Sequence, residues 1–155
     1  DFEASARSYA LAVDELNKVS SLRSSEMPMS SHPEVEQLQR EHHFLLLSSF
    51  LSLAQCHLKA GRYQLALENS EQALLLDSSS AKAVFRQAKS LEGLGRTSQA
   101  LEAFVQAHRL APGDREVERQ LRLAKARARQ QRVREKMLFG GLLETGLNET
   151  ERVSA

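Results

Sequence analysis

The sequence matches itself when it is shifted by 34 residues. The matched positions are Gly61, Arg62, Ala66, Leu67, Glu68, Gln72, Ala73 and Leu76, which recur as Gly95, Arg96, Ala100, Leu101, Glu102, Gln106, Ala107 and Leu110. A period of this length fits two helices joined by a turn, and such units bury their apolar faces only by stacking on neighbours. The alanines are small where paired helices must approach closely, and each glycine falls in a turn. The repeat therefore predicts an all-α solenoid without a sheet.

Helix boundaries follow from this register. We expect helices over about 64–76, 81–94 and 98–110, then a break at Pro112-Gly113 before a last helix capped by Asp114. The chain then divides into the second helix of an incomplete first repeat (1–19), a flexible insertion rich in Ser, Pro and Met (20–33), a second repeat with an extended first helix (34–78), a third repeat (79–112), a C-terminal extension helix (113–139) and a tail (140–155). The first helix of the incomplete repeat is expected to lie outside this sequence.

Composition limits the classes of partner. The 155 residues are 41% hydrophobic, enough for one core, and 21 basic against 20 acidic side chains leave a net charge of +1. That balance gives no overall field favouring nucleic acid or an anionic membrane. No apolar run approaches the roughly 20 residues of a membrane span. The single cysteine, Cys56, excludes a disulfide within the chain, so we expect a cytoplasmic location, with the nucleus as a second compartment.

The repeating unit resembles the tetratricopeptide repeat (TPR), which forms a right-handed superhelical solenoid. Three stretches narrow the resemblance: Ala54-Gln55-Cys56-His57-Leu58-Lys59, Ala81-Lys82-Ala83-Val84-Phe85-Arg86 and Arg134-Glu135-Lys136-Met137-Leu138-Phe139. Together with the insertion, they resemble the C-terminal TPR domain of FKBP-type immunophilins and related co-chaperones. This resemblance implies a domain that docks the acidic C-terminal peptide of heat-shock protein 90, with prolyl isomerisation confined to a separate upstream domain.

Lys82 and Arg86 are the candidate peptide-binding residues. Their spacing places both on one face of a repeat's first helix, the face that lines the groove of such a solenoid. A peptide that ends in a free carboxylate needs cationic donors of this kind. The resemblance places the Lys and Arg of the family's carboxylate clamp at these two positions and the clamp's second-repeat Asn at Ser52, which keeps a donor but has a shorter reach. The alternative is that the two cations form a solvated helix face.

The sequence offers no catalytic or metal-binding constellation. The five histidines have no cysteine partners at metal spacing, and the adjacent pair His42-His43 points to different sides of a helix. A lone helical cysteine such as Cys56 is usually a small buried hydrophobe. We therefore expect this chain to be no enzyme and to bind no cofactor. The two alternatives are a TPR adaptor for an unrelated partner and the non-catalytic half of a prolyl isomerase.

The last helix is strongly basic. It carries nine Arg or Lys residues between Arg115 and Lys136, and Val117, Leu121, Ala124 and Ala128 form an apolar stripe. A stripe of this kind is typical of a capping helix that closes the open end of a solenoid and keeps a polar outer face. The same composition also permits a basic amphipathic ligand for calmodulin or for an anionic surface.

Overall fold

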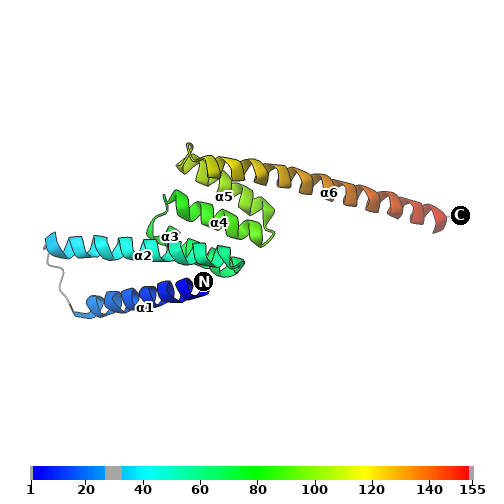
Figure 1. Ribbon diagram of the computed structural model, residues 1–155. Helices are drawn as coiled ribbons and strands as arrows, with labels where there is room; N and C mark the ends of the chain where they lie inside the picture. The colour runs from blue at the N-terminus through cyan, green and yellow to red at the C-terminus, as the bar shows by residue number, and fades with distance from the viewer. Residues whose placement is uncertain (1, 27–32, 154–155) are drawn as a thin grey trace.

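The fold consists of six helices in the part of the chain that the computed structural model describes, residues 2–26 and 33–153. The helices are α1 (Phe2–Glu26), α2 (Pro33–Lys59), α3 (Tyr63–Leu76), α4 (Ala81–Gly93), α5 (Thr97–Leu110) and α6 (Arg115–Val153). These ranges contain no strand. Each helix packs against the next one along the chain, and α2 also contacts α4 (Figure 1). The predicted all-helical solenoid of stacked pairs is confirmed.

Two equivalent turns set the 34-residue period. In the first, the amide N–H of Arg62 donates to the carbonyl of His57 at 2.9 Å, and in the second the N–H of Arg96 donates to Leu91 at 2.9 Å. Gly61 and Gly95 have φ values of 70° and 75°. This left-handed conformation after a helix is one that a side chain disfavours, so glycine is the residue that ends α2 and α4 sharply.

The main core lies where α3, α4, α5 and the first turns of α6 meet. Its largest side chain with no exposed surface is Phe104, whose ring meets that of Phe85 edge to face with centroids 5.8 Å apart. The stripe residues Val117, Leu121 and Ala124 of α6 are buried in the same cluster. The beginning of α6 therefore covers the end of the repeat array.

A second, smaller core joins α1 to α2. It is formed around Ala6, Val13, Leu46, Leu53 and Cys56. The Cys56 thiol is free and buried. At the edge of this core, a nitrogen of the His42 ring lies 2.8 Å from the carbonyl oxygen of Leu16, whose side chain packs against the cluster.

Two predicted boundaries are corrected by the structure. The first helix was expected to end at residue 19, but α1 continues to Glu26, so 20–26 is helical rather than loop. No glycine or proline interrupts that stretch, and Ser21 donates its hydroxyl to the carbonyl of Lys18 at 2.8 Å, which accommodates a serine inside a helix. Residue 33 of the expected insertion opens α2, because proline suits the first position of a helix. The remainder of that insertion, 27–32, lies outside the described residues.

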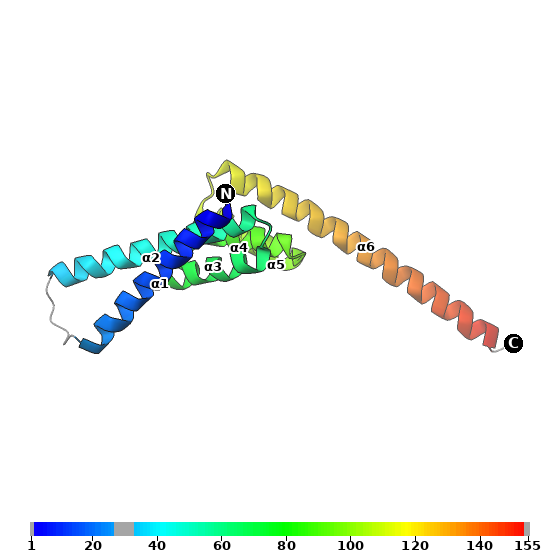
Figure 2. The ribbon, with the colours of Figure 1, turned by 60° about the horizontal axis from the view of Figure 1, so that its bottom comes forward.

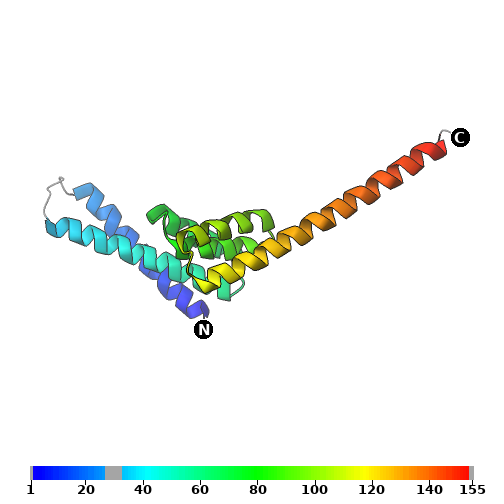
Figure 3. The same ribbon diagram turned by 90° about the horizontal axis from the view of Figure 1, so that it is seen from above.

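The second correction concerns the C-terminal end. The extension helix was expected to stop at residue 139, but α6 continues to Val153 through the expected tail. No proline follows Pro112, and the glycines at 140, 141 and 146 lower helix stability without ending the helix. The C-terminal half of α6 projects away from the packed helices (Figures 2 and 3). Residues 154–155 and residue 1 lie outside the described part.

Candidate peptide-binding groove

The face of α4 that carries the predicted cations is anchored by a capped helix end. The Ser80 hydroxyl accepts a hydrogen bond from the backbone N–H of Ala83 at 3.4 Å, which fixes where α4 begins. Lys82 in the first turn is exposed, and Arg86 one turn later is half-buried. The structure therefore keeps the two cations on one helix face, with Lys82 in solvent and Arg86 set deeper between helices.

Arg86 is held against α2. Its Nε donates to the side-chain oxygen of Gln55 at 3.3 Å, while its Nη1 is enclosed and has no hydrogen-bond partner among the described residues. Burial lowers the pKa of Arg86, whereas Cys56 nearby acts in the opposite direction. A guanidinium remains protonated at neutral pH in spite of such a shift. The site thus holds a permanent positive charge, and the Nη1 group of Arg86 makes no hydrogen bond with another described residue.

Ser52 stands on α2, and its side chain is hydrogen-bonded to its own helix. Its hydroxyl donates to the carbonyl of Ser48 at 2.8 Å within the same helix. No hydrogen bond between described residues joins Ser52 to Lys82 or Arg86. The amide side chain that faces Arg86 is instead Gln55, three residues further along α2, and sequence reasoning missed it.

A third cation extends the same face of α4 toward α6. Lys89 lies one turn beyond Arg86, and its Nζ is 2.6 Å from Glu92. The other carboxylate oxygen of Glu92 contacts Arg127 of α6, and the Glu92 side chain is 17% exposed. Burial first, and then the charge of Arg127, lower the pKa of Lys89. This network, which the sequence did not reveal, fastens α4 to α6 at one end of the cationic face of α4.

The first turn of α6 approaches the other end of that face. A small cavity of about 80 Å³ is lined by Lys82 and Phe85 of α4, by Glu116 and Val117 of α6 and by Asp114 just before α6. Carboxylates of α6 therefore stand near Lys82. An acidic ligand would meet these carboxylates as well as the cations of α4.

The described residues also bear on two other possibilities, a metal site and a membrane-spanning helix. Across 2–26 and 33–153, no three or more His, Cys, Asp or Glu side chains gather in a way that could hold a metal ion. Within the same ranges, no helix is both long and apolar enough to cross a membrane.

Known proteins resemble this chain in sequence and in fold. No family model matches the chain. The peptidyl-prolyl cis-trans isomerase FKBP4 of Mus musculus is 33% identical over 120 residues, which are 77% of this chain and 26% of that protein. The chain thus spans about a quarter of the length of this curated relative.

Two solved structures share the helical arrangement. The C-terminal TPR-containing domain of a Plasmodium falciparum FK506-binding protein superposes with a TM-score of 0.61 at 18% identity, covering 85% of this chain and 93% of that one. The second TPR domain of human RPAP3, in complex with the HSP70 peptide SGPTIEEVD, has a TM-score of 0.50 at 20% identity, covering 81% and 98%. The chain is a tetratricopeptide-repeat domain homologous to the C-terminal region of FKBP-type immunophilins.

Proposed function

We propose that this TPR domain docks the acidic C-terminal peptide of heat-shock protein 90 on the α4 face that carries Lys82 and Arg86. The observation that carries the proposal is the Arg86 guanidinium, which is charged, half-buried and has an enclosed Nη1 without an acceptor. Because the Arg86 side chain is only partly covered and has no carboxylate partner among the described residues, an incoming carboxylate would form a charge-assisted hydrogen bond with its exposed part. The RPAP3 domain of similar fold is described with an acidic chaperone peptide.

The contacts would divide among three side chains. Arg86 would form the directional contact with a carboxylate, and exposed Lys82 would act as a point charge. Because the Ser52 hydroxyl already donates to a carbonyl of its own helix, Gln55 would supply the donor in its place through its side-chain amide. Gln55 uses its carbonyl oxygen for Arg86, which leaves its NH₂ group for the peptide.

In this account the chain is a binding domain and catalyses no reaction. It aligns with the TPR region of FKBP4 rather than with an isomerase domain. Any prolyl isomerase activity would belong to a different segment of a longer protein. The proposed partner would place the domain in the cytoplasm.

A calmodulin-type partner for α6 is the second candidate. Such a partner wraps the apolar face of a basic helix, but Val117, Leu121 and Ala124 are already buried against α4 and α5. Apart from Leu123, the large exposed apolar side chains that the structure describes on α6 lie further along, from Val133 to Phe139. The capping function of α6 therefore has the stronger support, and calmodulin would have to bind the projecting part alone.

Isothermal titration tests the main proposal. The C-terminal peptide of heat-shock protein 90 is titrated into the chain and into Arg86→Ala, Arg86→Lys and the matched control Arg40→Ala, which removes an exposed arginine of α2. We expect Arg86→Ala to weaken binding by about tenfold or more, because a hydrogen bond to a charged group contributes about 1.5–3 kcal/mol. Arg86→Lys should recover only part of that loss, and Arg40→Ala should bind as the parent does. Equal affinities for all four proteins would refute the proposal.

A further inference from the structure

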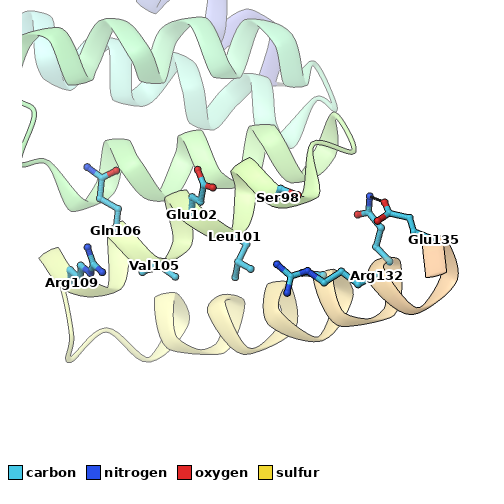
Figure 4. A pocket seen from close by; sticks show the side chains of 10 residues that line it. Ser98, Leu101, Glu102, Val105, Gln106, Arg109, Arg132 and Glu135 are labelled. Atoms are coloured by element: carbon cyan, nitrogen blue, oxygen red, sulfur yellow. Dashed lines mark hydrogen bonds between the residues drawn. The ribbon is translucent and has the colours of Figure 1, made fainter. Parts of the chain in front are cut away.

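A groove runs between α5 and α6. Its volume is about 620 Å³, and residues from one face of α5 and one face of α6 line it (Figure 4). The side chains that matter here are Leu101, Glu102, Val105 and Arg109 of α5 and Ala128 and Arg132 of α6. Leu101, Val105 and Ala128 are half-buried, whereas the charged residues are exposed. The groove therefore has an apolar floor and a charged rim.

The repeat register explains why this groove exists. Leu67 of α3 occupies the position equivalent to Leu101, 34 residues earlier, and it is only 3% exposed because the next helical pair covers it. The turn glycines Gly61 and Gly95 would be followed by a third one at 129, but that residue is Arg129. Without a glycine there, α6 continues straight instead of turning back. The position of one antiparallel helix beside α5 and α6 is thus left vacant.

We propose that this groove receives an amphipathic helix of a partner protein, with its apolar stripe on Leu101, Val105 and Ala128 and with an acidic flank. The helix would lie antiparallel to α6, as the second helix of each repeat does to the first. Arg109 and Arg132 stand at the rim, where they would meet the acidic flank (Figure 4). Glu102 and Glu135 also line the groove, so the preference for an acidic flank comes from the positive charge along α6 rather than from the rim alone. The proposal does not depend on the peptide site on α4.

The positive charge of α6 favours an acidic partner helix over a second copy of the chain. The segment of α6 from Arg122 to Lys136 carries seven Arg or Lys residues and one Glu. Two such segments side by side would repel each other. Of the seven cations, only Arg127 takes part in an ion pair recorded for the described residues. An acidic partner helix along α6 would reduce this surplus of positive charge, most directly at Arg132, the one of the seven that lines the groove.

Fluorescence anisotropy with two synthetic probes tests the proposal on the whole chain. Both are 18-residue peptides cross-linked to remain helical, with leucines along one face, and their flanks carry either glutamate or lysine. We expect the glutamate peptide to bind at least tenfold more tightly than the lysine peptide, and the difference should shrink as salt rises. Similar affinity for the two peptides would overturn the proposal.

Substitutions in the groove and outside it test whether the glutamate peptide binds there. Val105→Glu should weaken the glutamate peptide by at least tenfold, whereas Leu75→Glu, at an apolar residue of α3 that is 78% exposed, should leave it unchanged. Arg132→Glu, which changes only an exposed side chain, should shift preference toward the lysine peptide. Arg86→Ala should have no effect, which separates this site from the one on α4. Equal losses for Val105→Glu and Leu75→Glu, or a chain that sediments as a dimer dissociated by Val105→Glu, would contradict a partner helix.

Discussion

Leu121→Ala measures how much the first turns of α6 stabilise the repeat array. Leu121 is 7% exposed and belongs to the core cluster that α6 shares with α4 and α5. The substitution removes three carbons, which at about 0.8 kcal/mol for each buried methylene comes to about 2.4 kcal/mol. The cavity that remains raises the expected loss to about 3 kcal/mol. For a chain of this size, such a loss lowers Tm by about 6–12 °C.

Leu123 provides the matched control two residues further along the same helix. It is 41% exposed, so Leu123→Ala should cost no more than about 0.5 kcal/mol. The assay is urea unfolding followed by circular dichroism at the helix band, with the slope m unchanged between variants. A loss below about 1 kcal/mol for Leu121→Ala, or equal losses for the two variants, would show that α6 is not a packed cap.

Three further predictions rest on single local features. Gly95→Ala should destabilise the chain by about 1–2 kcal/mol because φ is positive there, whereas Gly113→Ala, where an added Cβ meets nothing, should be nearly neutral; urea unfolding compares them. Asp114→Ala should cost about 1 kcal/mol, since its carboxylate caps two backbone N–H groups of α6 at 2.8 and 3.1 Å. Hydrogen bonds from Arg119 and then Gln120 lower the pKa of Glu116 from 4.5 to about 2. The stability that Glu116 contributes is therefore present above pH 4.5 and lost as pH falls toward 2, and Glu116→Gln should flatten the acid unfolding curve in that window.

Most of the fold could be predicted from the sequence because each repeat carries a glycine at the turn between its two helices. Gly61 and Gly95 mark two turns 34 residues apart, and the structure has positive φ at both. The ends of α1 and α6 could not be placed in this way. Ser8 and Ser21 of α1 donate their hydroxyls to carbonyls of the same helix, and α6 contains no proline, so composition typical of a loop or a tail is compatible with helix.

The site was predicted only in the part that lies on one helix. The spacing of Lys82 and Arg86 fixes their common face without knowledge of the tertiary structure. The contact of Arg86 with Gln55 joins residues 31 positions apart, and that of Glu92 with Arg127 joins residues 35 apart. Such contacts depend on how neighbouring helices are packed and rotated, which periodicity alone does not determine.

A double-mutant cycle on the peptide carboxylate tests the proposed function most directly. The C-terminal peptide of heat-shock protein 90 is prepared as the free acid and as the C-terminal amide, and both are titrated into the chain and into Arg86→Ala. If Arg86 holds the terminal carboxylate, amidation should weaken binding to the chain by about tenfold or more but should change binding to Arg86→Ala little. An amidation loss of the same size in both proteins, or no binding of the free acid to the chain, would contradict a carboxylate site at Arg86.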